Sequence, residues 1–158
     1  MFCSTTLAIM SFMGLAEPAA ATGLSAHVGH YPFEEIGCVS FFDEPLVARA
    51  VTAAAGGEAL DFIASLDAAP LVVRQEDALV AIACSDGDCD NANAALAITP
   101  LGRLIALCLY AKDGGHGGKP GEMRWIGESL ARTLPAARSR ACPHDPEQFL
   151  EAYAQARS

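Results

Sequence analysis

The residues best suited to chemistry form a short acidic segment between two cysteines, Cys84-Ser85-Asp86-Gly87-Asp88-Cys89. In an oxidising compartment, cysteines that flank a short turn can pair with each other. A disulfide that closes a tight loop fixes its shape and lowers the entropy lost when the loop docks on another molecule. We therefore interpret these six residues as a partner-binding loop. The alternative is that the bridge only pins the end of a strand.

The acidic segment also resembles a metal loop, because Asp86, Asp88, Asp90 and the following asparagines place oxygen atoms at alternate positions. Calcium needs several such oxygens. An EF-hand loop that began at Asp86 would need its closing Glu at residue 97, which is Ala. We therefore interpret the segment as a solvated acidic turn and predict no metal and no cofactor, with calcium binding at this turn as the alternative.

The sequence contains no arrangement typical of a catalytic site. The four histidines stand at positions 27, 30, 116 and 144, without the spacing of a metal site. A hydrolase needs a nucleophile activated by a base, and no such pair stands out. We predict that the protein is not an enzyme.

Charge narrows the class of partner. The 158 residues include 19 acidic and 10 basic side chains, for a formal net charge of −9. This surface repels phosphate backbones, and no Lys/Arg cluster offsets the repulsion, which argues against nucleic-acid binding. A cationic protein partner would be attracted instead.

The first 21 residues resemble a signal peptide. A short apolar run from Leu7 to Leu15 is followed by Pro18 and by Ala19-Ala20-Ala21, the small residues that a signal peptidase accepts. The run lacks a preceding Lys or Arg, and a buried N-terminal helix is the alternative. We predict a signal peptide over 1–21, a single mature domain over 22–158, no membrane span and a periplasmic location.

Five cysteines remain after residue 21, an odd number that leaves at least one unpaired or paired between chains. Cys108 lies inside an apolar run, and we interpret it as a small buried hydrophobic residue. The expected disulfides are then Cys84 with Cys89 and Cys38 with Cys142.

Hydrophobic patterning predicts an α+β fold with a central antiparallel sheet of about five strands and helices packed on it. Residues 22–42 form an irregular arm with a short strand near Cys38–Phe41. The expected helices are a segment with Pro45 in its first turn, Glu58–Leu66, Gly127–Leu134 and Pro146–Ala156. The expected strands are Leu71–Arg74, Ala78–Cys84, Ala94–Ile98, Arg103–Tyr110 and an edge strand, Glu122–Ile126.

The order of these features resembles the Ivy family of periplasmic inhibitors of vertebrate (C-type) lysozyme. The resemblance covers approximately Ala59 to Gly127 and is carried by Ala83-Cys84, Asp88-Cys89 and Arg124-Trp125-Ile126-Gly127. It implies an α+β fold, a periplasmic location, often a homodimer, and a protein partner that is a lysozyme or another peptidoglycan-cleaving enzyme. The partner's cleft would be occluded by the protruding Cys84–Cys89 loop.

The chain departs from the family at the loop itself, which in the family resembles Cys-Lys-Pro-His-Asp-Cys. Gly87 stands at the His position and Asp86 adds a carboxylate. Facing a catalytic carboxylate, Asp86 would meet a repulsion of about 4 kcal/mol at about 4 Å and an effective dielectric constant of about 20. A non-inhibitory Ivy-like envelope protein is therefore the alternative. A similar tetrad, Cys142-Pro143-His144-Asp145, lies outside the resembling region, and we interpret it as coincidence.

Overall fold

The computed structural model describes residues 23–85, 88–115, 118–127, 130–134 and 141–157. The predicted signal peptide, residues 1–21, lies outside the described residues. Within the described ranges, no helix combines the length and the apolar character needed to cross a membrane.

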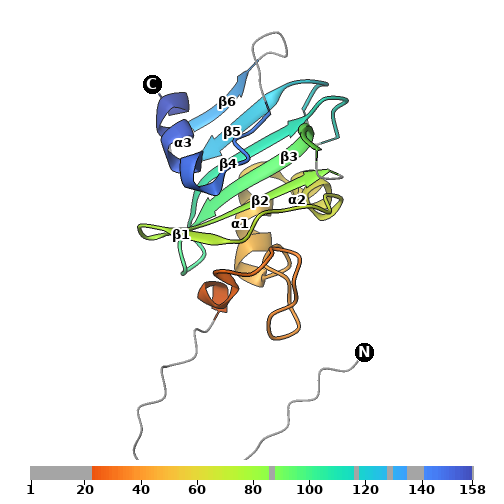
Figure 1. Cartoon of the computed structure of the whole chain (residues 1–158). Coiled ribbons are helices and arrows are strands. Elements are labelled where there is room, and N and C mark those ends of the chain that lie inside the picture. Colours follow the sequence, from red (N-terminus) through yellow and green to blue (C-terminus); the bar gives the residue numbers. More distant parts are fainter. Residues whose placement is uncertain (1–22, 86–87, 116–117, 128–129, 135–140, 158) are drawn as a thin grey trace, which may run out of the picture.

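The centre of the fold is one antiparallel sheet of six strands, in which each strand pairs with the next one along the chain (Figure 1). The strands are β1 (Val73–Gln75), β2 (Ala78–Ser85), β3 (Asp88–Ile98), β4 (Leu104–Ala111), β5 (Met123–Gly127) and β6 (Leu130–Leu134). The predicted α+β class is confirmed, with six strands where about five were expected. The connection from β1 to β2 is the two residues Glu76 and Asp77, and that from β3 to β4 is residues 99–103, as antiparallel pairing allows.

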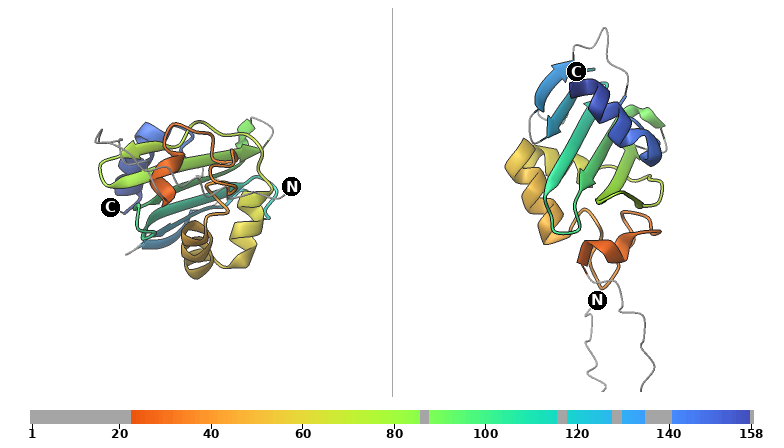
Figure 2. Two further views of the ribbon diagram at one scale, coloured as in Figure 1. Left: turned by 90° about the horizontal axis from the view of Figure 1, so that it is seen from below. Right: turned by 90° about the vertical axis from the view of Figure 1, so that its left-hand side faces the viewer.

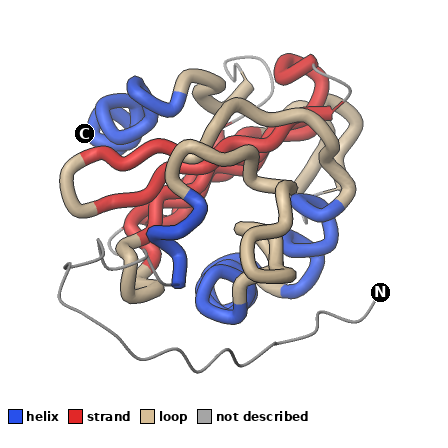
Figure 3. Tube along the Cα trace, turned by 60° about the horizontal axis from the view of Figure 1, so that its bottom comes forward, coloured by secondary structure: helices blue, strands red, loops and turns tan. Residues whose placement is uncertain are grey.

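Helices cover both faces of the sheet (Figure 2). One face packs against α1 (Pro45–Ala55), α2 (Gly57–Ala64) and parts of the N-terminal arm, which begins with the 3₁₀ helix η1 (Gly23–His27). The other face packs against α3 (Phe149–Arg157), which follows the 3₁₀ helix η2 (Pro146–Gln148). In Figure 3 the strands lie between the C-terminal helix and the other helices.

Burial on both faces explains why β2 and β4 are apolar almost throughout instead of alternating with polar residues. Leu79 and Ala81 of β2 point into the core beneath α1 and α2, whereas Val80 and Ile82 point into the core beneath α3. The two cores are separated only by the sheet. Successive side chains of one strand therefore lie on opposite faces of the sheet.

The turn between β3 and β4 is fitted closely to α1. The Gly102 amide donates to the Thr99 carbonyl at 2.9 Å, as expected for the predicted turn Thr99-Pro100-Leu101-Gly102. Gly102 has a φ of +85°, and a Cβ atom there would lie 2.9 Å from Cβ of Leu46. Both the backbone conformation and the packing therefore require glycine.

Three sequence-based expectations about the elements are wrong. Residues 130–134 form strand β6 and not a helix, and β5 is consequently an inner strand and not an edge. Leu130, Ala131 and Leu134 share helical spacing, but pairing with β5 satisfies the backbone groups that β5 would otherwise leave open. In the arm, only an isolated bridge between Ile36 and Val39 replaces the expected strand near Cys38–Phe41.

Candidate functional site

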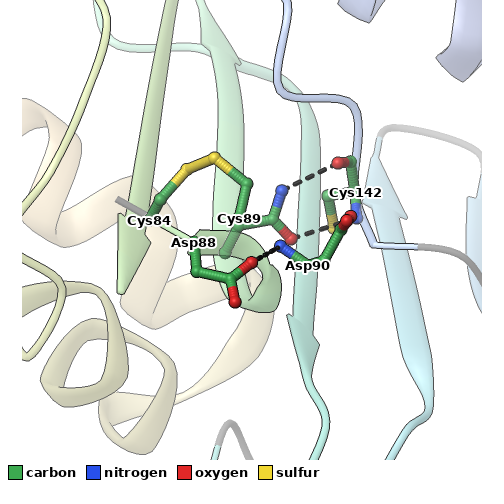
Figure 4. The surroundings of a disulfide bond; sticks show 6 residues. Cys84, Asp88, Cys89, Asp90 and Cys142 are labelled. Atoms are coloured by element: carbon green, nitrogen blue, oxygen red, sulfur yellow. Dashed lines mark hydrogen bonds between the residues drawn. A yellow bond between two sulfur atoms is a disulfide. The ribbon is translucent and has the colours of Figure 1, made fainter. Parts of the chain in front are cut away.

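The predicted disulfide between Cys84 and Cys89 is present, with 4.7 Å between the two Cα atoms. It joins the end of β2 to the start of β3, beside the pair formed by Ser85 and Asp88. Two members of the predicted loop, Asp86 and Gly87, lie outside the described residues. The described part of the loop is thus a disulfide-closed hairpin turn at one end of the sheet (Figure 4).

The hairpin is irregular next to the disulfide. Ser85 pairs with Asp88, but the preceding residue Cys84 pairs with Asn93, so Cys89 to Ala92 have no partner on β2. Within this bulge the Asp90 amide donates to Oδ1 of Asp88 at 3.0 Å (Figure 4). The side chains of Asp88 and Asp90 are both exposed. A bulge of this kind bends the strand and changes the direction of its side chains, so the exposed acidic segment continues beyond Cys89.

The second disulfide differs from the prediction. Cys142 is bonded to Cys108 of β4 and not to Cys38, which is itself disulfide-bonded. Cys142 and Cys108 belong to the core beneath α3, whereas aromatic residues of the arm near Cys38, Phe41 and Phe42, pack into the opposite core. The part of the arm that follows Cys38 is therefore anchored on the face of the sheet opposite to Cys142. Cys108 is buried as predicted, but it is not a free thiol.

The segment that contains Cys142 is also held by hydrogen bonds to a buried asparagine, Asn93. Nδ2 of Asn93 donates to the Cys142 carbonyl at 2.7 Å, and the Cys142 amide donates to Oδ1 of Asn93 at 3.0 Å (Figure 4). Both residues are fully buried. The side-chain amide thus reproduces the two hydrogen bonds of a β-sheet pair and satisfies backbone groups that would otherwise be buried without partners. The sequence analysis did not identify Asn93.

This double attachment brings the tetrad Cys142-Pro143-His144-Asp145 to the turn. Cys142, Pro143 and His144 line a hollow of about 520 Å³ together with Asp90 of the bulge. Asp145 caps the start of η2, because its side chain accepts hydrogen bonds from the Glu147 amide and from Nε2 of Gln148. The tetrad was interpreted as coincidence from its position in the sequence, but in the fold it shares a surface with the acidic turn.

Replacing Asn93 with alanine is expected to lower the free energy of unfolding by about 3 kcal/mol, because the amide and the carbonyl of Cys142 would remain buried without partners. Urea denaturation followed by circular dichroism measures the change. Asn91→Ala is the matched control, since that side chain is exposed and should change stability by less than about 0.5 kcal/mol. Equal stability of the two variants would contradict the role assigned to Asn93.

The described residues contain no group of three or more His, Cys, Asp or Glu side chains arranged to hold a metal ion. In the described part of the turn, Oδ1 of Asp88 is used by a backbone amide. Asp86, the first oxygen donor of the calcium alternative, lies outside the described residues, so calcium binding at the turn stays a prediction.

The Cys84–Cys89 and Cys108–Cys142 disulfides are compatible with a protein of the periplasm or the cell exterior, where disulfides persist. Comparison of the chain with protein-family models, with curated proteins and with solved structures found no match. The Ivy resemblance consequently stays a prediction carried by the residues of the chain itself.

Proposed function

We propose that the protein is a divergent Ivy-like periplasmic protein that binds a peptidoglycan-cleaving enzyme, with a C-type lysozyme as the first candidate. The contact is the turn closed by Cys84 and Cys89, and the effect is occlusion of the enzyme's cleft without any chemical step. The observation that carries the proposal is the disulfide-closed turn itself, at one end of the sheet and with exposed carboxylates on Asp88 and Asp90.

Rigidity supports this role. The disulfide, the pairing of Ser85 with Asp88 and the hydrogen bond from the Asp90 amide to Asp88 all restrict the turn before any partner arrives. Binding by a restricted loop loses less conformational entropy than binding by a free one. The turn is therefore suited to insertion into, or seating across, a preformed cleft.

Charge supports the same class of partner. The chain carries a formal net charge of −9, and C-type lysozymes are basic outside the cleft. Opposite charges accelerate encounter and strengthen attraction at low salt. We expect complex formation to weaken as salt concentration rises, because exposed charges are screened.

The missing loop histidine changes the proposed contact. Gly87 cannot offer the imidazole that the family presents to the catalytic carboxylates. His144 is exposed and lines the hollow shared with Asp90, so an imidazole is available on the surface beside the turn. We therefore propose that the turn and the Pro143-His144 segment meet the partner together.

The test separates binding from inhibition. Egg-white lysozyme is titrated with the protein by calorimetry, and lysis of a bacterial suspension is followed by turbidity at stoichiometric and excess protein. We expect a one-to-one complex and slower lysis. The double variant Asp88→Ala/Asp90→Ala removes the two exposed carboxylates of the described turn and should bind about tenfold more weakly, a typical loss for charge pairs at the edge of a buried contact.

The double variant Glu35→Ala/Asp77→Ala is the control, since both carboxylates are exposed and lie in the arm and the β1–β2 turn. Its affinity should equal that of the unmodified protein. If calorimetry detects no heat of binding and excess protein does not slow lysis, lysozyme is not the partner. A calcium titration of the same sample then tests the non-inhibitory alternative.

A further inference from the structure

A second hollow lies on the other side of the turn, beneath α2. It has a volume of about 710 Å³ and is lined by α2 and the two residues after it, by Ser85, Ala92 and Ala111 of β2, β3 and β4, and by residues 113–115 and 118. Its carboxylates are Glu58 and Asp61 of α2 and Asp113 after β4. We call it the acidic hollow.

The floor of the acidic hollow is apolar and its rim is anionic. Phe62, Leu66 and Ala111 are buried and form the floor, whereas Glu58, Asp61 and Asp113 are exposed at the rim. No ion pair among the described residues involves any of the three carboxylates. None of the described residues that line the hollow is a Lys, Arg or His. Among the described residues, three like charges thus face a shared space.

This combination matches one kind of side chain. Arginine has an apolar stem that packs on a hydrophobic surface and a charged head that remains near water. Its planar guanidinium presents five donors, enough to reach carboxylates on two different elements. The hydroxyl oxygens of Ser65 and Ser85, which also line the hollow, add acceptors.

The acidic hollow is continuous with the turn. Ser85 follows Cys84 directly, and because side chains alternate along a strand, Cys84 points into the core beneath α3 while Ser85 lines the hollow beneath α2. The turn therefore lies between the acidic hollow and the hollow that contains His144. A partner seated on the turn would reach both.

We infer that the acidic hollow receives an arginine side chain of the protein that seats on the Cys84–Cys89 turn, an inference that rests on the proposed function. The guanidinium lies among Asp61, Asp113 and Glu58, and its stem lies on Phe62 and Leu66. The contact also orients the partner, because it holds one arginine of the partner at a single position beside the turn.

The first experiment does not need the partner. Isotope-labelled protein is titrated with N-acetyl-arginine amide and, separately, with N-acetyl-citrulline amide, its neutral analogue, while backbone amide signals are followed by NMR. We expect saturable shifts around Asp61, Ser85 and Asp113 with the arginine compound only. The variant Asp61→Asn/Asp113→Asn should lose these shifts, whereas Glu35→Gln/Asp77→Asn, which removes the same charge elsewhere, should keep them. Glu58 is left unchanged because it lies in the first turn of α2 and stabilises that helix.

The second experiment measures egg-white lysozyme binding by the same variants. We expect Asp61→Asn/Asp113→Asn to bind about tenfold more weakly and the control to bind within about twofold. If lysozyme binds but the two variants bind equally, the inference is wrong and the proposed function stands. If lysozyme does not bind at all, the proposed partner is wrong, and the NMR titration alone tests whether the acidic hollow binds arginine. Equal shifts with the arginine and citrulline compounds, or no shifts, would overturn the inference that the acidic hollow receives an arginine.

Discussion

Replacing Cys108 and Cys142 together with alanine is expected to lower the free energy of unfolding by about 4 kcal/mol. The bridge closes a loop with a sequence separation of 34 residues, and the entropy that such a bridge removes from the unfolded chain grows with loop length. Typical domains are stable by only about 5–15 kcal/mol, so this loss is large. Urea denaturation of the oxidised protein, followed by circular dichroism, provides the measurement.

The control is the disulfide between Cys84 and Cys89. Cys84 and Cys89 are separated by only 5 residues, and the same relation predicts a loss of about 2 kcal/mol when both become alanine. The Cys108/Cys142 double variant should therefore be less stable than the Cys84/Cys89 double variant, although it is the Cys84–Cys89 turn that is the proposed partner contact. The opposite order, or equal losses, would show that the segment around Cys142 is held mainly by Asn93.

Replacing Trp125 with alanine is the second large effect that we expect, a loss of about 3–5 kcal/mol. Trp125 is 2% exposed and is the main aromatic contact between β5 and α3. Its ring stacks on Phe149 at 5.4 Å between centroids and lies 5.9 Å from the ring of Tyr153. Removing it leaves a cavity beneath α3, because the neighbouring rings can only partly fill the space.

The position of the loss can be measured separately. Chymotrypsin cleaves after aromatic residues, so release of α3 should expose Phe149 and Tyr153 to cleavage at concentrations that leave the unmodified protein intact. Trp125→Phe is the control, since it keeps an aromatic ring, and it should cost about 1.5 kcal/mol or less. Cleavage of Trp125→Ala at the rate of the unmodified protein would contradict the proposed packing of α3.

Local signals were sufficient for most of the sheet and for the three α-helices of the described residues. Pro45 begins α1 and apolar runs mark β2 and β4, because backbone preference and burial act within a few neighbouring residues. Cys84 and Cys89 flank a turn short enough that their pairing could also be predicted locally. The early start of β3, six residues before the expected one, could not, because the bulge depends on pairing with β4 as well as β2.

The candidate site divides in the same way. Its turn, its carboxylates and its acidic charge could be read along the chain, since they depend on residue type and on neighbours only. The partner of Cys142, the role of Asn93, the place of His144 beside Asp90 and the strand β6 were decided by the tertiary structure. The first three bring together residues distant in sequence on one face of the sheet, and only the folded chain determines which residues share that face. Strand β6 follows β5 directly in the sequence, but its conformation is determined by pairing with that strand.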